Sequence, residues 1–174
     1  VELRKAGITL PIMVMNPEEN AFESIVEYQL EPELYSFELL RLFEAFLQRQ
    51  GEEQYPVHIE IETGMNRLGF VTEDIQKLGS VLTSSVSFKV QSVFSHLAAS
   101  EDPAQDAFTM LQFEQFSKAV KELREIVGYD FISHIANTAA IIRHPCDPGK
   151  VARCIWGRPA RFAPVSFAGT SRRR

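Results

Sequence analysis

One strand-like stretch and the loop behind it carry the side chains of this sequence that are best suited to chemistry. Residues 57–62 alternate strictly between apolar and ionisable types, so a strand here would present His58, Glu60 and Glu62 on one face. Arg67 follows in a loop bracketed by two glycines five residues apart. An edge strand with one wet face would explain the alternation alone. A loop-borne arginine directly after the strand favours a functional site, because inward-facing ionisable groups must be paired or used.

Two further polar groups follow predicted strands. His96 closes the strand expected at 88–94, and Asn137 and Thr138 follow the strand expected at 131–135. A single histidine at a strand end is commonly a hydrogen-bonded structural residue, whereas three strands that each end in a polar cluster indicate a shared site. Parallel-sheet enzymes place their chemistry at these carboxyl ends.

Motifs for metals or phosphates are missing from the sequence. The four histidines lack the paired spacing of a metal motif, and no glycine-rich phosphate loop of the GxGxxG or Walker type is present. We therefore expect no metal site.

Strand and helix patterns alternate along the first 144 residues. The expected strands cover residues 11–15, 57–62, 88–94 and 131–135. Two of the expected helices begin at Asn16 and at Thr72. The other three cover residues 36–50, 106–127 and 137–142. This alternation predicts an α/β fold with a parallel sheet and crossover helices. The pattern leaves a doubly wound sheet and a barrel open, and a full (β/α)8 barrel needs about 250 residues, so a barrel would be partial.

Composition excludes several classes of protein. The chain has 174 residues, of which 45% are hydrophobic and 24% charged, as in an ordinary globular domain. The net charge of -5 argues against nucleic acid as a partner, and no apolar run approaches the ~20 residues of a membrane span. Two cysteines are too few for a disulfide framework or a cysteine-rich zinc site.

The charge balance changes sign near residue 145. Residues 1–144 carry 22 acidic and 11 basic side chains, whereas residues 145–174 carry one acid, Asp147, and seven bases. Both cysteines and the only tryptophan also lie in this last segment. We expect residues 1–144 to form the folded body and residues 145–174 to be a divergent, irregular basic tail. This tail is either an ordinary disordered tail or foreign sequence, such as the product of a shifted reading frame.

Four stretches of the sequence resemble the alanine racemase family. Residues 62–70 read ETGMNRLGF and are similar to the family's (D)TGMxRLGF element. Residues 94–98, FSHLA, resemble its THFA element, and residues 134–140, HIANTAA, resemble its H-x-ANSAA element. Residues 3–15 resemble its LRxxGI…PIxVL stretch. Their order and spacing agree over residues 1–143.

The resemblance implies a fold and a set of roles. The family fold is a pyridoxal-phosphate-binding (β/α)8 TIM barrel followed by a β-rich domain, and this chain would supply roughly strands 3 to 7 with their helices. Arg67 and His96 would be the catalytic, cofactor-contacting residues, at the phenolic oxygen and near the pyridine ring. Asn137 and Thr138 would lie near the cofactor phosphate. Glu60 would pair with Arg67 and orient it, at a position where many members carry a carbamylated lysine, and guanidinium–carboxylate geometry favours such a charge-assisted pair. The alternative is that Glu60 pairs with His58 or another neighbour and Arg67 faces solvent.

The same resemblance implies a function for the intact protein. We expect a fragment of a cytoplasmic, pyridoxal 5'-phosphate-dependent racemase that interconverts L-alanine and D-alanine for peptidoglycan synthesis. The intact family is homodimeric, and its partner is a small amino-acid substrate rather than nucleic acid or membrane. No lysine here has the family's K-A-x-A-Y-G context, and the second base, a tyrosine of the C-terminal domain, is not in this stretch. We therefore expect the chain to be inactive alone.

Three alternatives remain open. One is a non-catalytic pyridoxal-phosphate-binding protein on a single barrel. Another is a related fold-type III amino-acid racemase or decarboxylase. The third is a structural or interaction fragment that binds no cofactor at all.

Overall fold

A parallel sheet forms the centre of the protein. The computed structural model describes residues 1–144; the expected basic tail at 145–174 lies outside the described residues. Five strands follow one another across the sheet, and a sixth, β4 (Phe70–Val71), pairs with the end of the third. The five strands are β1 (Met13–Val14), β2 (Glu31–Leu34), β3 (Tyr55–Glu62), β5 (Phe88–Phe94) and β6 (Ile132–His134). All of these pairings are parallel.

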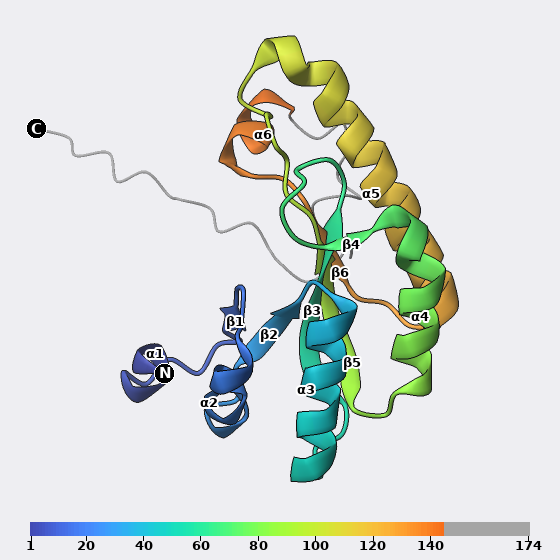
Figure 1. Cartoon of the computed structure of the whole chain (residues 1–174). Helices are drawn as coiled ribbons and strands as arrows, with labels where there is room; N and C mark the ends of the chain where they lie inside the picture. Colours follow the sequence, from blue (N-terminus) through green and yellow to red (C-terminus); the bar gives the residue numbers. More distant parts are fainter. Residues whose placement is uncertain (145–174) are drawn as a thin grey trace, which may run out of the picture.

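Helices connect the strands. They are α1 (Glu2–Lys5), α2 (Phe22–Glu27), α3 (Phe37–Gln50), α4 (Ile75–Ser84), α5 (Asp106–Val127) and α6 (Thr138–Arg143). Short 3-10 turns precede three of them, at Glu19–Ala21, Thr72–Asp74 and Pro103–Gln105. Figure 1 shows α3, α4 and α5 along one side of the sheet, and the loop after β5 rising above the strand ends to the start of α5.

The order of the strands decides between the two architectures that the sequence left open. A doubly wound sheet reverses its strand order at a switch point. Here the order β1-β2-β3-β5-β6 follows the chain without a reversal. The expected parallel α/β fold is confirmed, and the strand order is that of a barrel wall.

The longest helices form where the sequence predicts them. The Ser36 hydroxyl caps α3 by accepting a hydrogen bond from the Leu39 N–H at 3.2 Å. Gly51 and Gly128 end α3 and α5 in the left-handed conformation, with φ of 72° and 74°. The predicted ends at these two glycines are confirmed.

The first part of the chain differs from the prediction. The strand expected at 11–15 shrinks to Met13–Val14, and the helix expected from Asn16 begins at Phe22 after a 3-10 turn. Asn16 itself takes a positive φ of 49°, which a helical N-cap does not use. Strand β2 was not predicted, and it supplies the wall between β1 and β3.

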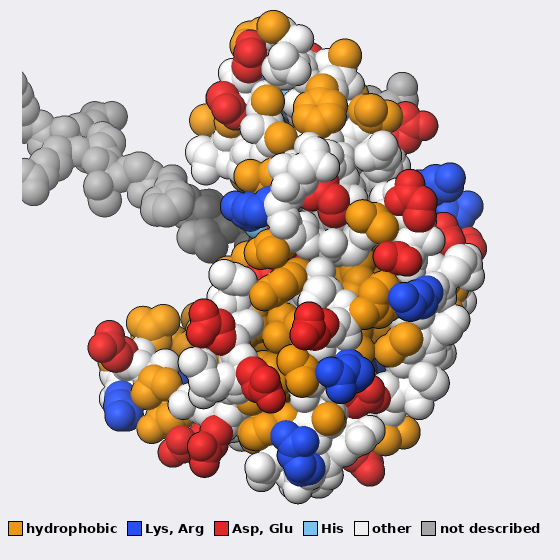
Figure 2. Space-filling model, viewed as in Figure 1, with side chains coloured by type: hydrophobic (Ala, Val, Ile, Leu, Met, Phe, Trp, Pro, Cys, Tyr) orange, Lys and Arg blue, Asp and Glu red, His pale blue; other side chains and the backbone are white. Residues whose placement is uncertain are grey.

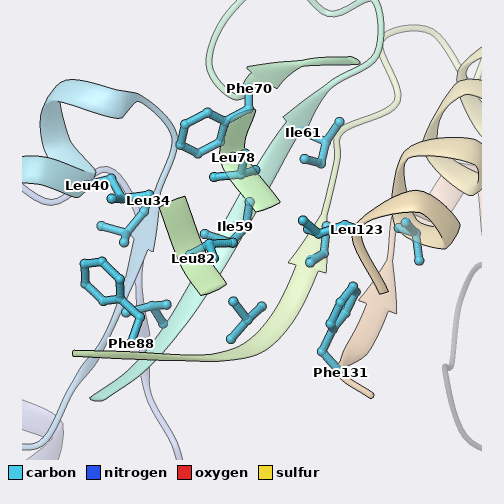
Figure 3. Close-up of a cluster of buried hydrophobic side chains, with 14 of the residues drawn as sticks. Leu34, Leu40, Ile59, Ile61, Phe70, Leu78, Leu82, Phe88, Leu123 and Phe131 are labelled. Carbon is cyan, nitrogen blue, oxygen red and sulfur yellow. The ribbon is translucent and has the colours of Figure 1, made fainter. Parts of the chain in front are cut away.

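The hydrophobic core lies between the sheet and helices α3, α4 and α5. Val57, Ile59 and Ile61 project from β3 into this layer and are fully buried. Figure 3 shows Ile59 and Ile61 among Leu78 and Leu82 of α4 and Leu123 of α5. Truncating such a side chain to alanine costs about 2–5 kcal/mol, so this layer fixes the strands that carry the site.

The opposite face of the sheet carries the polar side chains. Figure 2 shows that the outline is notched on the side away from α4 and α5. Polar side chains of β2, β3 and β5 project to this inner face, because successive side chains of a strand point to opposite faces and the apolar ones of β3 face the helices. No helix among residues 1–144 is long and apolar enough to cross a membrane.

Candidate active site

The inner face of β3 holds the predicted carboxylate. Glu60 is only 3% exposed, while its neighbours Ile59 and Ile61 point to the helices. The predicted division of this strand into an apolar outer face and a polar inner face is therefore confirmed. A carboxylate buried to this extent must be matched by donors or by a proton.

The side chain of Glu62 shapes the loop that carries Arg67. Its carboxylate accepts hydrogen bonds from the backbone N–H groups of Gly64 and of Arg67, the latter at 3.3 Å. Gly69, with φ of 114°, lies so close to β3 that a Cβ would come within 2.6 Å of the Glu62 nitrogen. The two glycines let the loop fold back on the strand, and the Arg67 side chain stays 51% exposed.

Glu60, His96 and Arg67 meet at the carboxyl ends of β3 and β5. The His96 ring donates from Nδ1 to Glu60 Oε1 at 2.9 Å. The Arg67 guanidinium is an ion-pair neighbour of the same oxygen at 4.0 Å. Glu60 is therefore next to Arg67, as expected, but its direct hydrogen bond is to His96, and the Arg67 guanidinium lies 4.0 Å from the same oxygen.

The environment of His96 favours its neutral form. Burial, and after it the positive charge of Arg67, lower the pKa of His96 below the usual 6.5. A Glu60 carboxylate only accepts hydrogen bonds, so Nδ1 carries the single ring proton and Nε2 has a free lone pair. The ring packs edge-on against Phe94, with centroids 5.7 Å apart, and remains 37% exposed.

Asn137 and Thr138 lie at the start of α6. The Asn137 side-chain oxygen caps this helix by accepting from the Ala140 N–H at 3.0 Å, and it also accepts from the Ser100 hydroxyl at 2.7 Å. These bonds fix the amide and leave its NH2 group as a donor. Thr138 is exposed at the first position of the helix. Both residues lie at the same edge as His96, since they follow β6, the parallel neighbour of β5.

Gln112 is a site residue that the sequence did not reveal. From a fully buried position on α5 it donates to the His96 carbonyl at 3.1 Å and accepts from the Ala98 N–H at 3.0 Å. It also reaches Thr63, whose hydroxyl shares a 2.7 Å hydrogen bond with Ser95. The sequence around Gln112 shows only the pattern of an amphipathic helix, so its contacts could not be predicted without the structure.

A second polar chain runs lower on the inner face. His58 Nε2 donates to Glu31 at 2.9 Å, the Ser92 hydroxyl donates to His58 Nδ1 at 2.6 Å, and His134 Nε2 donates to Ser92 at 3.3 Å. Glu31, His58 and Ser92 thus have the order of an acid–base–nucleophile triad. Ser92 is buried within β5 and already accepts from His134, so it lacks the exposure that a nucleophile needs. Among residues 1–144 no cluster of His, Cys, Asp or Glu is arranged to hold a metal ion.

Comparison with known proteins assigns the chain to a family. A family model described as "Alanine racemase, N-terminal domain" matches residues 1–159. The chain belongs to the alanine racemase family. The alanine racemase of Synechocystis sp. is 37% identical over 147 residues, covering 82% of this chain and 38% of the relative. That of Clostridium tetani is 35% identical over 149 residues, covering 83% and 38%.

Solved alanine racemases share the fold. The structure from Clostridium difficile 630 superposes with a TM-score of 0.74 at 28% identity and covers 83% of this chain and 37% of the solved one. The complex of that enzyme with cycloserine gives 0.73 at 29% identity, covering 80% and 38%. The chain thus spans about two fifths of the length of its relatives. The expected partial barrel is confirmed, since the matched region is the alanine racemase N-terminal domain.

Proposed function

We propose that this chain is the part of a pyridoxal-phosphate-dependent alanine racemase that forms the floor of the cofactor site. The contact of His96 with Glu60, beside Arg67 at the carboxyl ends of two barrel strands, supports this most directly. The intact enzyme would interconvert L-alanine and D-alanine. Its D-alanine would serve peptidoglycan synthesis, and the enzyme would act as a cytoplasmic homodimer.

The donor set at this edge fits pyridoxal phosphate. The half-exposed Arg67 guanidinium suits the phenolic oxygen of the cofactor and the carboxylate of an amino acid. The neutral, half-exposed ring of His96 suits the face of a pyridine. The Asn137 amide and the Thr138 hydroxyl are donors suited to a phosphate, and Ser100 already fixes the amide in place.

Each residue then has a definable task. Bound pyridoxal phosphate would hold the charge left on the substrate α-carbon after proton removal. Glu60 keeps the proton on His96 Nδ1, which fixes the ring orientation and directs the Nε2 lone pair away from the carboxylate. Arg67 orients the substrate through its carboxylate, while the Glu62-bound loop holds the guanidinium at the strand ends.

Groups for proton transfer would have to come from outside the described residues. The described lysines have other surroundings. Three lie over the rings of Tyr28, Phe37 and Tyr129, and the other two are exposed on α5: Lys5, Lys77, Lys89, Lys118 and Lys121. We therefore propose that the chain alone does not catalyse racemisation. The expected result is no turnover of L-alanine above a protein-free control when pyridoxal phosphate is added. Measurable turnover would contradict this part of the proposal.

Cofactor binding separates the proposed site from the inert-fragment alternative. Pyridoxamine 5'-phosphate is a suitable probe, because its amine cannot react with surface lysines as an aldehyde would. Fluorescence titration should show saturable binding that Arg67→Ala or His96→Ala weakens at least about tenfold, equivalent to about 1.4 kcal/mol. The exposed Arg41 of α3 provides the control, since Arg41→Ala should leave binding unchanged. Binding that ignores Arg67 and His96 would count against the site.

Substrate turnover by the enzyme that includes this region separates the remaining alternatives. A racemase should exchange the α-proton of alanine with deuterium from solvent, and Arg67→Ala should reduce that exchange. A decarboxylase would release carbon dioxide, and a non-catalytic cofactor carrier would do neither. Either of the last two results would replace the racemase proposal while leaving the site in place.

A further inference from the structure

Two buried carboxyl groups lie side by side behind His96. Glu33 of β2 is 1% exposed and Glu60 of β3 is 3% exposed. In the parallel pairing of these strands, Glu33 is opposite His58. His58 precedes Glu60 by two residues, so Glu33, His58 and Glu60 project to the same face of the sheet. Because the two strands are adjacent and both side chains are on the same face, the two carboxyl groups are neighbours. Strand β2 was not predicted, so this pair emerges from the fold alone.

One oxygen of each carboxyl group in this pair lacks a hydrogen-bond donor among residues 1–144. Glu33 Oε2 accepts from the Asn16 backbone N–H at 2.8 Å, and Glu60 Oε1 accepts from His96. The other two oxygens, Glu33 Oε1 and Glu60 Oε2, are buried and have no donor partner among residues 1–144. Two ionised carboxylates in this position would repel each other and leave two acceptors unsatisfied.

A single proton resolves both problems. We propose that Glu33 is a positioning residue of the site, which carries a proton near neutral pH and donates it to Glu60 Oε2. The pair then holds one negative charge, located on Glu60. The inference deepens the proposed function, because Glu60 in turn holds His96 and stands next to Arg67.

The surroundings assign the proton to Glu33 rather than to Glu60. Glu60 accepts from the His96 N–H and lies 4.0 Å from the Arg67 guanidinium, whereas among residues 1–144 Glu33 accepts only from a backbone N–H. Burial, and after it the neighbouring Glu60, raise the pKa of Glu33 to about 8. From the β1 side Glu33 meets only the Asn16 N–H, a weaker influence. The titratable groups of the inner face around Glu33 are Glu31 on its own strand, His58 and Glu60 on β3, Arg67 after β3, and His96 after β5.

The proton on Glu33 determines whether Glu60 is held in one orientation. While it is present, Glu60 is satisfied at both oxygens and has a fixed orientation toward His96. Once it is lost at alkaline pH, the two adjacent carboxylates repel each other and must separate. We therefore expect Glu60 and His96 to be held in place at neutral pH and to become more mobile above about pH 8.

Infrared spectroscopy of the whole chain tests where the proton lies. A buried protonated carboxyl should give its own carbonyl band at pH 7, and in the wild type that band should titrate with a midpoint near pH 8. Glu33→Gln should abolish the band. The exposed Glu53 provides the control, since Glu53→Gln should retain it. A wild type without the band at pH 7, or a folded Glu33→Gln variant that keeps it, would overturn the proposal.

The pH dependence of unfolding gives an independent test. The pKa of Glu33 is raised on folding, so the folded state keeps a proton that the unfolded state loses above about pH 4.5. The equilibrium constant for folding should therefore fall by up to tenfold per pH unit between about 4.5 and 8. Glutamine mimics the protonated acid, with one acceptor for Asn16 and one donor for Glu60, so Glu33→Gln should remove this fall. Parallel profiles for the two proteins would contradict the proposal.

These two measurements involve no cofactor. Failure of pyridoxamine phosphate to bind would therefore count against the proposed function alone. Loss of the infrared band or of the pH effect would count against the role of Glu33 alone.

Discussion

Gln112 ties together the backbone that presents His96. Its amide is fully buried and reaches the His96 carbonyl, the Ala98 N–H and the Thr63 hydroxyl. Leucine fills nearly the same volume but leaves the first two backbone groups without a partner. Each buried group that loses its partner costs about 1–3 kcal/mol, so we expect Gln112→Leu to lower the free energy of unfolding by roughly 2–6 kcal/mol.

Urea denaturation measures this effect. The partly exposed Gln115 lies three residues further along α5 and provides a control, since Gln115→Leu should change stability by less than about 0.5 kcal/mol. Equal losses from the two variants would show that Gln112 acts only as a packed side chain.

The histidines of the inner face predict acid sensitivity. Burial is the largest cause that lowers the pKa of His58, His96 and His134 on folding. The unfolded state therefore takes up protons first, and stability should be lost as pH falls below about 6.5. In His58→Gln the amide can still donate to Glu31 and accept from Ser92. This variant should lose less stability between pH 7 and pH 5.5 than the wild type, as measured by urea denaturation. An unchanged pH slope would contradict the assignment for His58.

The return of the chain from the arginine loop to β4 depends on one glycine. Gly69 has a φ of 114°, and a Cβ there would lie 2.6 Å from a backbone nitrogen and 2.8 Å from a backbone carbon of β3. Gly51 also has a positive φ, but a Cβ there would meet nothing within 4 Å. We expect Gly51→Ala to cost about 1–2 kcal/mol and Gly69→Ala clearly more, because only the second forces the backbone of β4 away from β3.

Amide hydrogen exchange reports where each change acts. Gly69→Ala should lose protection at β4 and at the end of β3, whereas Gly51→Ala should affect only the end of α3. Equal stability losses without a local change at β4 would contradict this reason for Gly69.

The sequence predicts elements well when they are long and end at a clear stop signal. The strand at 88–94 and the helix at 106–127 have the predicted bounds, since each shows a sustained pattern and Gly128 ends the helix. Strand β2 gives no such signal, because it has four residues, carries a proline at its second position and alternates acids with other types. Missing β2 also meant missing Glu33.

The sequence predicts which residues belong to the site better than it predicts which of them contact one another. The motifs at Arg67, His96 and Asn137 lie at one edge of the sheet because each follows a parallel strand. Arg67, the predicted partner of Glu60, lies 4.0 Å away, whereas His96 from the next strand makes the direct contact at 2.9 Å. Contacts between strands depend on register and on loop shape, and neither can be derived from residue types alone.

At the scale of the molecule, each of the two outer strands of the sheet has one partner among the described residues. Among residues 1–144, β1 pairs only with β2, and β6 pairs only with β5. Large apolar side chains are exposed near these two edges, with Leu10 at 71% and Ile142 at 72%. Unpaired strand edges and exposed apolar side chains both favour contacts between molecules. We therefore expect the chain to self-associate as its concentration rises.

Light scattering coupled to size-exclusion chromatography measures this tendency. Leu10→Lys combined with Ile142→Lys should shift the distribution toward smaller species, because each adds a charge next to an open edge. Val86 is 63% exposed but precedes β5 in the interior of the sheet, so Val86→Lys removes the same kind of surface away from the edges. That variant should associate like the wild type. A compact monomer at all concentrations would contradict the open-edged sheet, and equal effects of the variants would assign association to general surface hydrophobicity.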